Sequence, residues 1–284
     1  MARFFVDELP AEGSHYTLTG ENAEHARVLR LRPGEAVTLC DGLGMDCPCT
    51  VWDGLTLTAG PTLPCPAEPA VRVSVWIAFP KADKAEHVIQ KAVELGATEL
   101  VLFPSRYCVS RPEGKALDKK LERWQKIARS AAEQSRRGVI PAVRAVESYP
   151  QALAEAARAE LPVLFYENES GYSLHDALAE AAFQAVAGSD ALIAPVIAAD
   201  NDAAARSMTE EMGPSAPLTL HSGRQRRPVS VSLMTGAEGG FSEEEIAKAK
   251  GAGMKICTLG PRILRCETAP LAGLTALMYA LGEM

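Results

Sequence analysis

Residues 233–270 read LMTGAEGGFSEEEIAKAKGAGMKICTLGPRILRCETAP, and this stretch decides how the rest of the chain is interpreted. The apolar run Val229–Met234 leads directly into the glycine-rich segment Gly236–Gly240. Ser242, followed three residues later by Glu245, has the spacing of a capping box and predicts the start of a helix. The pattern therefore predicts a strand, a glycine loop and a capped helix.

A second apolar strand, residues 254–259, leads into another tight turn at Gly260–Pro261. In an open α/β sheet, ligands bind at the carboxyl ends of the strands, and glycines let backbone groups approach a flat ligand closely. The two turns therefore indicate a site for an adenosine-bearing cofactor. The glycines match neither the dinucleotide fingerprint nor a P-loop, so two ordinary helix-entry loops remain the alternative on pattern alone.

Two motifs, GAEGGFSEEEI at residues 236–246 and LGPRILRCETAPLAGL at residues 259–274, closely resemble the signature of a known family. This is the RsmE family, the 16S rRNA uridine N3 methyltransferases of the SPOUT class. The resemblance covers most of the chain except roughly residues 185–228. It extends through these further segments: His25–Arg30, Lys81–Lys84, Gln90–Gly96, Ser105–Arg106 and Ala132–Arg136.

The resemblance implies an α/β fold, a SPOUT trefoil-knot methyltransferase domain with an N-terminal PUA-like β-barrel that binds RNA. It also implies that two subunits pair as a homodimer and that the cofactor is S-adenosylmethionine. The implied cofactor contacts are Leu233, Gly236, Glu238, Gly239, Gly240, Leu259, Gly260, Ile263 and Leu264. The chain departs from the family pattern at Ala237 and Cys266, and neither change removes an evident functional group.

The implied reaction is methylation of a uridine N3 in 16S rRNA of the small ribosomal subunit. Uridine N3 carries a proton at neutral pH, so the site needs a base or cations that stabilise the anion. Glu267 is the first candidate base and Glu238 the second, while Arg262 and Arg265 are candidates for stabilising charge on the uracil oxygens. A structural role is the alternative for each, since glutamates also cap loop amides and arginines also pair with phosphate.

Length and composition fit a globular protein of two domains, with 284 residues and 47% hydrophobic content. We find neither an export signal nor an apolar run long enough to cross a membrane, and therefore expect a cytoplasmic protein. The seven cysteines form no C-x-x-C pair, which predicts reduced thiols and no metal site.

Residues 1–68 contain many short strands separated by glycine turns, which predicts a small β-barrel. The proline-rich segment 61–70 is the predicted linker, and residues 71–284 alternate strands and helices as a parallel sheet requires. Within the second domain the alternation fails at residues 188–228, which we interpret as an insertion.

Charge is distributed unevenly in a protein whose net charge is −7. Residues 106–144 carry eleven basic and four acidic side chains, which is compatible with RNA binding, although a solvated helix face with internal ion pairs is the commoner meaning of such a run. The family resemblance implies RNA, and not DNA, as the partner. With the resemblance, the candidate RNA contacts are Arg27, Arg30, Arg32, Arg106 and Arg136. Two other functions stay open: a SPOUT enzyme acting on a tRNA base or a ribose 2′-hydroxyl, and a non-catalytic rRNA-binding assembly protein.

Overall fold

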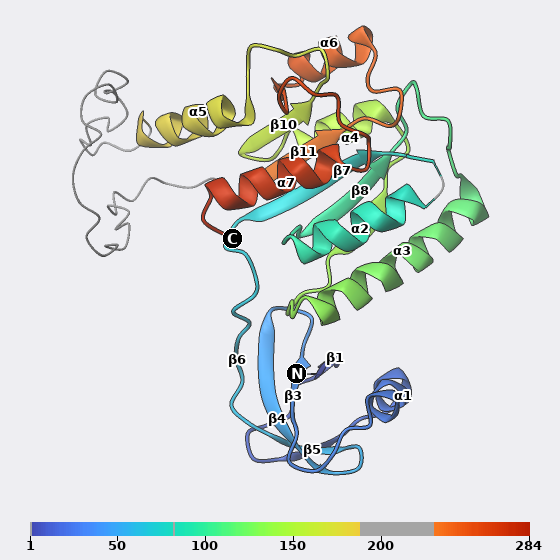
Figure 1. The fold of residues 1–284 in the computed structure, drawn as a ribbon, viewed down its shortest axis with the longest axis vertical. Helices are drawn as coiled ribbons and strands as arrows, with labels where there is room; N and C mark the ends of the chain where they lie inside the picture. Colours follow the sequence, from blue (N-terminus) through green and yellow to red (C-terminus); the bar gives the residue numbers. More distant parts are fainter. Residues whose placement is uncertain (1, 82, 188–229) are drawn as a thin grey trace, which may run out of the picture.

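The computed structural model describes residues 2–81, 83–187 and 230–284. They form two β-sheets in two parts, a smaller N-terminal part and a larger part that holds the C-terminus (Figure 1). The insertion predicted at residues 188–228 lies outside the described residues. No helix of the described residues is both long and apolar enough to span a bilayer.

The N-terminal sheet has the order β1-β3-β4-β5-β2, with β6 paired to β4. All its pairs are antiparallel except β1 with β3, and a turn at Asp53-Gly54 joins β4 to β5. A core that includes Phe4, Leu39 and Leu57 fills its interior. The elements are β1 (Ala2–Phe5), β2 (His15–Thr17), α1 (Gly20–Leu29), β3 (Ala36–Cys40), β4 (Met45–Asp53), β5 (Thr56–Ala59) and β6 (Leu63–Pro64).

The larger sheet is entirely parallel, with the order β12-β10-β11-β7-β8-β9. Its strands are almost wholly apolar because both faces are covered, as the alternating strand and helix pattern predicts. The strands are β7 (Arg72–Ala78), β8 (Glu99–Phe103), β9 (Ala142–Ala145), β10 (Leu161–Phe165), β11 (Ser230–Thr235) and β12 (Lys255–Cys257). The sequence analysis did not predict β9, whose four residues Ala-Val-Arg-Ala have little strand character.

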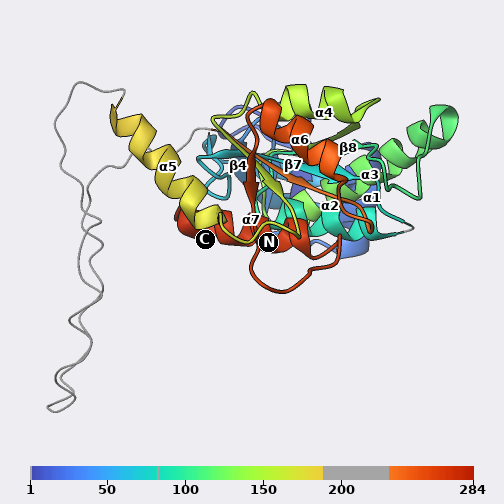
Figure 2. The same ribbon diagram turned by 90° about the horizontal axis from the view of Figure 1, so that it is seen from above.

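Helices cover both faces of this sheet (Figures 1 and 2). Side chains alternate along β7, so that Val75 and Ile77 face one core and Trp76 faces the other. The first core packs against α2 (Lys84–Glu94), α3 (Gly114–Gln134), α5 (Leu174–Ala187) and α7 (Ala269–Ala280). The second packs against α4 (Tyr149–Ala156) and α6 (Glu243–Gly251).

A buried polar cluster joins the two parts of the molecule. Arg3 in β1 forms a bidentate pair with Asp46 in β4, at 2.6 and 2.8 Å, and also donates to the backbone oxygen of Arg137 just after α3. Arg137 in turn pairs with Glu68 in the linker at 2.9 Å. Glu68 therefore fixes the linker to the end of α3, where Arg3 of the small sheet also binds, and these contacts set how the small sheet sits against the large one.

Candidate functional site

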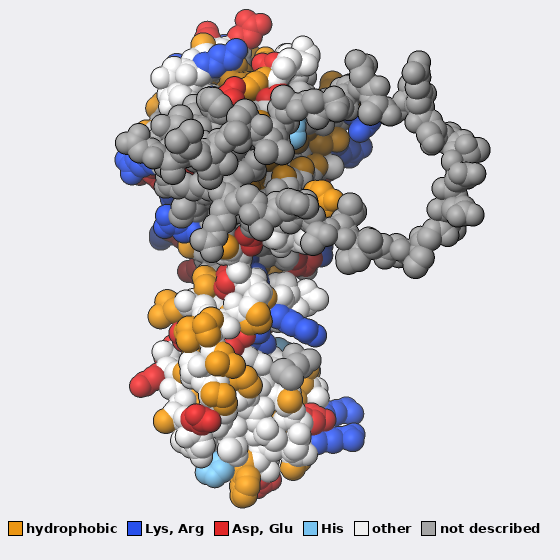
Figure 3. Space-filling model, turned by 90° about the vertical axis from the view of Figure 1, so that its left-hand side faces the viewer, with side chains coloured by type: hydrophobic (Ala, Val, Ile, Leu, Met, Phe, Trp, Pro, Cys, Tyr) orange, Lys and Arg blue, Asp and Glu red, His pale blue; other side chains and the backbone are white. Residues whose placement is uncertain are grey.

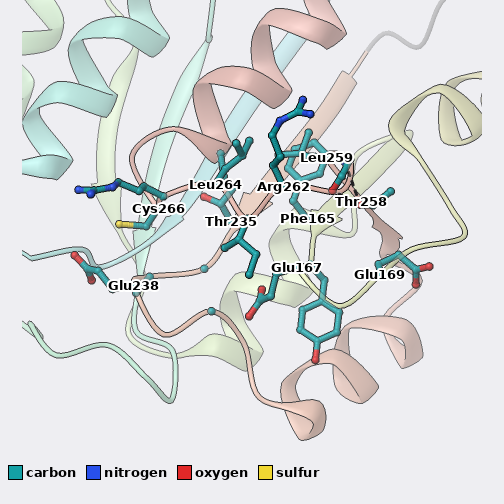
Figure 4. A pocket seen from close by; sticks show the side chains of 18 of the residues that line it. Phe165, Glu167, Glu169, Thr235, Glu238, Thr258, Leu259, Arg262, Leu264 and Cys266 are labelled. Carbon is teal, nitrogen blue, oxygen red and sulfur yellow. Dashed lines mark hydrogen bonds between the residues drawn. The ribbon is translucent and has the colours of Figure 1, made fainter.

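A pocket of about 830 Å³ opens at the carboxyl ends of β10, β11 and β12, which are neighbours in the sheet (Figure 4). Three loops build it, one after each of these strands. The lining residues are Phe165–Glu167, Glu169 and Ser170 from the first loop, Thr235–Gly240 from the second, and Thr258–Cys266 from the third, with Lys84 of α2 and Ala269 of α7. This is the edge at which open α/β sheets bind ligands.

The loop after β11 is shaped by the predicted capping box. The Ser242 hydroxyl accepts from the Glu245 backbone N–H, and the Glu245 carboxylate accepts from the Ser242 N–H. The same buried carboxylate accepts the Arg106 backbone N–H at 2.8 Å, which ties the loop after β8 to α6. Gly240 has φ +64°, and a Cβ there would collide with the Glu167 carboxylate, so the turn requires glycine.

The loop after β12 is held to the loop after β10 by backbone hydrogen bonds. Tyr166 N–H donates to the Cys257 carbonyl, and Thr258 N–H donates to the Tyr172 carbonyl at 2.8 Å. Gly260 follows with φ +97°, and a Cβ there would meet no other group within 4 Å. The turn is therefore open on its side-chain side, and the Gly260 N–H and carbonyl are both hydrogen-bonded to the Thr258 hydroxyl.

Lys84 connects two of the loops through charge. Its Nζ lies 3.0 Å from Glu267 and 3.2 Å from Glu238, and Cys266 Sγ lies 3.5 Å away. The hydrogen bond from Lys84 lowers the pKa of Glu267 to about 2. Burial alone raises the pKa of Glu238, but the donors Lys81 N–H and Lys84 outweigh it and the pKa falls. Both carboxylates are therefore ionised, and the bonds to them raise the pKa of Lys84, which stays a cation.

Burial raises the pKa of the Cys266 thiol to about 12. The thiol is consequently protonated at neutral pH and is a poor nucleophile. It takes part in the cluster as a weak hydrogen-bond partner of Glu267, at 3.3 Å.

Of the nine residues predicted to contact the cofactor, eight line the pocket, and Leu233 does not. Leu233 is fully buried on β11, where its side chain faces the core shared with α7. The Leu233 side chain points away from the pocket because side chains alternate between the two faces of a strand. The residues of β11 and its loop that line the pocket begin only at Thr235. Its side chain therefore does not line the pocket, and the cofactor contact of Leu233 stays a prediction.

The predicted catalytic residues fall into two groups. Arg262 and Arg265 are exposed and line the pocket, and neither forms an ion pair with a carboxylate of the described residues. Figure 4 shows the Arg262 side chain pointing away from Glu167. Glu267 is held by Lys84 at the pocket's edge, beside Cys266.

The predicted RNA contacts lie in three separate places. Arg27, Arg30 and Arg32 are exposed on and after α1. Arg106 is exposed on the loop after β8, where its guanidinium pairs with Glu244 at 2.8 Å. Arg136 is exposed at the end of α3, where its backbone oxygen meets Cys65 at the junction of the two parts.

Much of the basic stretch 106–144 is neutralised by acids that the sequence does not place beside it. Arg123 pairs with Glu86, Arg137 with Glu68, and Arg144 with Glu99 and Glu155. These residues are ion-paired, but with acids from other elements, whereas Arg129 with Glu133 is a pair within the helix of the kind predicted as the alternative. The face drawn in Figure 3 shows other basic side chains gathered along one edge of the N-terminal part.

Sequence reasoning missed the loop after β10. Tyr166, Glu167, Glu169 and Ser170 all line the pocket, although no glycine motif marks their segment. The available signal was their position directly after a buried strand. Lys84 was noted only as part of a resembling segment, without a role.

Comparison with known proteins agrees with this geometry. A family model described as an RNA methyltransferase domain matches residues 67–194 and 193–278, and an RNA methyltransferase PUA domain matches residues 18–51. The ribosomal RNA small subunit methyltransferase E of Bacillus subtilis is 30% identical, covering 98% of this chain and 96% of that protein. The protein of the same name from Mycobacterium bovis is 32% identical, over 96% of this chain and 89% of its own length.

A solved structure supports the same grouping. The crystal structure of a ribosomal RNA small subunit methyltransferase E from Neisseria gonorrhoeae bound to S-adenosyl methionine matches with a TM-score of 0.72. It is 27% identical, and the match covers 99% of this chain and 98% of that one.

Proposed function

The chain belongs to the ribosomal RNA small subunit methyltransferase E family, and on that premise we propose that it methylates N3 of a uridine in 16S rRNA, using S-adenosylmethionine. The fold class predicted from the sequence, a SPOUT domain with an N-terminal PUA-like part, is confirmed by the same matches. One observation supports the activity above the others: a pocket formed by three loops at the ends of adjacent parallel strands, two of them turning on glycine.

The pocket's residues fit S-adenosylmethionine. Its volume lies in the usual range for small-molecule sites, roughly 300–1,000 Å³. Leu259 and Leu264 offer apolar side chains to a flat base, while the turn at Gly260 leaves space beside its α-carbon. Carboxylates on the wall, among them Glu167, suit a ligand that carries positive charge.

Bound there, S-adenosylmethionine supplies an electrophilic methyl group for in-line attack by a ring nitrogen. The chain must hold the uracil in place and assist the loss of its N3 proton. Glu267 is poorly suited as the base, because a carboxylate with a pKa of about 2 holds a proton only weakly. We assign it a positioning role through Lys84.

Arg262 and Arg265 are better suited than Glu267 to assist the loss of the N3 proton, because they can stabilise the negative charge that develops on the uracil. Each is a cation at the pocket without a carboxylate partner among the described residues. A cation beside the uracil oxygens lowers the pKa of N3 and stabilises the developing negative charge, so that the proton can pass to water. Because N3 lies on the pairing edge, the target uridine must be unpaired or flipped out.

RNA binding would be shared between the parts of the chain. We propose that residues 1–68 form the RNA-binding domain, through Arg27, Arg30 and Arg32, and that residues 71–284 form the methyltransferase domain. Arg106 and Arg136 then contact RNA from the catalytic side. Arginines at such positions neutralise phosphates without reading the sequence.

Two further features of the proposal concern assembly and location. We propose that Tyr279 on α7 and Met284, whose side chains are 76% and 64% exposed, contribute to a homodimer interface. A substrate in the small ribosomal subunit places the protein in the cytoplasm.

The test is methyl transfer from labelled S-adenosylmethionine to small ribosomal subunits from a strain that lacks this gene, followed by mass spectrometry of the nucleosides. We expect 3-methyluridine, and we expect Arg265→Gln to lose activity while the remote charge variant Lys248→Gln keeps it. Label in another nucleoside, or only in tRNA, would contradict the proposed target. Cofactor binding without transfer to any RNA would contradict the activity.

A further inference from the structure

Three carboxylates line the pocket, and they differ in what holds them. Glu238 accepts from the Lys81 backbone N–H and pairs with Lys84. Glu169 accepts the backbone N–H groups of Ser170 and Gly171, at 3.0 and 2.9 Å. These two carboxylates are therefore engaged by the protein itself.

Glu167 is the exception. Within residues 2–81, 83–187 and 230–284, its carboxylate forms no hydrogen bond and no ion pair. Its neighbour in space is the α-carbon of Gly240, where an added Cβ would collide with it. Figure 4 shows the Glu167 and Glu169 side chains turned in different directions, with the Glu167 carboxylate on the side of the glycine loop.

The position of Glu167 is fixed by the fold. It follows β10 by two residues, and β10 lies between β12 and β11 in the sheet. Its loop is thus the middle one of the three, with a glycine turn on each side. A backbone hydrogen bond from Tyr166 to Cys257 holds the loop immediately before Glu167.

An ionised carboxylate in a pocket wall is stabilised strongly by a ligand cation that reaches it, because charge-assisted bonds are the stronger class. The protein's own cations at the pocket do not pair with it in the described residues: Lys84 is committed to Glu238 and Glu267, and neither Arg262 nor Arg265 forms an ion pair with Glu167. S-adenosylmethionine carries two positive groups, the sulfonium and the α-ammonium. Either one is chemically suited to Glu167.

We propose that Glu167 is a cofactor-selectivity residue whose carboxylate binds a cationic group of S-adenosylmethionine. This inference rests on the proposed function and deepens it. The packing of the carboxylate against Gly240 supplies a second reason for glycine there: any side chain at residue 240 would displace the group that recognises the charge.

The experiment measures binding by calorimetry on the full-length chain and its Glu167→Gln variant. Three probes separate the two cations. S-adenosylmethionine has both cations, S-adenosylhomocysteine lacks the sulfonium, and 5′-methylthioadenosine lacks both. Glu243→Gln, which removes one exposed carboxylate from the first turn of α6, is the matched charge control.

We expect Glu167→Gln to weaken S-adenosylmethionine binding by about tenfold or more, the size of one charge-assisted hydrogen bond. The melting temperature should not change, because the carboxylate bonds to nothing else in the described structure. If Glu167→Gln loses affinity for S-adenosylmethionine alone, the sulfonium is the group that Glu167 binds. Equal loss for S-adenosylmethionine and S-adenosylhomocysteine, with 5′-methylthioadenosine unaffected, identifies the α-ammonium.

Two results would overturn the inference while leaving the proposed function intact. One is a change of less than about threefold in the affinity of Glu167→Gln for S-adenosylmethionine. The other is an equal loss of affinity for all three probes, which would indicate a distorted pocket. Failure of the unmodified chain to bind S-adenosylmethionine at all is a different result, and it would refute the proposed function together with this inference.

Discussion

Replacing Asp46 by asparagine should destabilise the whole protein, because Asp46 pairs with the buried Arg3, whose guanidinium also donates to the Arg137 carbonyl across the junction of the two parts. Arg3 and Asp46 have side chains only 8% and 9% exposed, and two short hydrogen bonds connect them. Burial lowers the pKa of Arg3, but the bond to Asp46 and nearby charge outweigh it and keep the guanidinium ionised. Asp46→Asn therefore leaves a buried cation without its counter-charge.

The magnitude follows from the burial. Removing one partner of a buried ion pair costs about 3–5 kcal/mol, whereas an exposed pair contributes about 0–1 kcal/mol. We expect Asp46→Asn to lower the free energy of unfolding by about 3 kcal/mol or more, which at this chain length corresponds to a fall in Tm of roughly 6–12 °C. The matched control is Glu94→Gln, which breaks the more exposed pair with Lys91 and should cost below about 1 kcal/mol.

Urea unfolding monitored by circular dichroism, and calorimetry for Tm, are the assays. The double variant Arg3→Met with Asp46→Leu removes both charges, and it should recover much of the stability that the single variant loses, because the uncompensated charge is the main cost. A loss below about 1 kcal/mol in Asp46→Asn would refute the reasoning, since the junction would then tolerate an unpaired buried arginine.

Three further outcomes follow from the site. Gly260→Ala places a side chain on a backbone with φ +97°, which strains any residue other than glycine even though the space beside the turn is open. Because the strain shifts the turn that lines the pocket, we expect S-adenosylmethionine binding, measured by calorimetry, to weaken by tenfold or more. Unchanged affinity would contradict our account of the turn. The lowered pKa of Glu267, about 2 against an ordinary 4.5, gives stability that is present above pH 4.5 and lost as the pH falls towards 2, so Lys84→Met should raise that pKa in an NMR titration and reduce the loss of stability in this window. Arg27→Ala combined with Arg30→Ala should weaken RNA binding and reduce the slope of log K against log salt by about 1.4 on single-stranded RNA, whereas an unaltered slope would exclude phosphate contacts there.

The sequence by itself determined the parts of the site that depend on neighbouring residues. The capping box at Ser242 and Glu245 is formed as predicted, because both partners lie within one helical turn. The glycine turns could be predicted for the same reason, since their backbone conformations are set locally. The succession of strands and helices after residue 70 likewise predicted a parallel sheet with both faces covered.

The tertiary structure decided which of these parts meet. Strand β10 lies between β11 and β12 although both follow it in the chain, and this order puts Glu167 on the middle one of the three loops that line the pocket. Lys84 reaches Glu238 and Glu267 from a helix 154 and 183 residues earlier in the chain, so no spacing along the sequence could reveal that cluster.

The same distinction explains what the sequence left undecided. The resemblance placed Leu233 at the cofactor, but the direction of a strand side chain depends on the register of the sheet, and this one faces the core. A run of basic residues left a charged surface and an ion-paired face both open, and Glu68, Glu86 and Glu99 come from other elements to pair with several of them. Local backbone conformation is determined by adjacent residues, whereas ion pairs and pocket walls depend on packing between segments far apart in the chain.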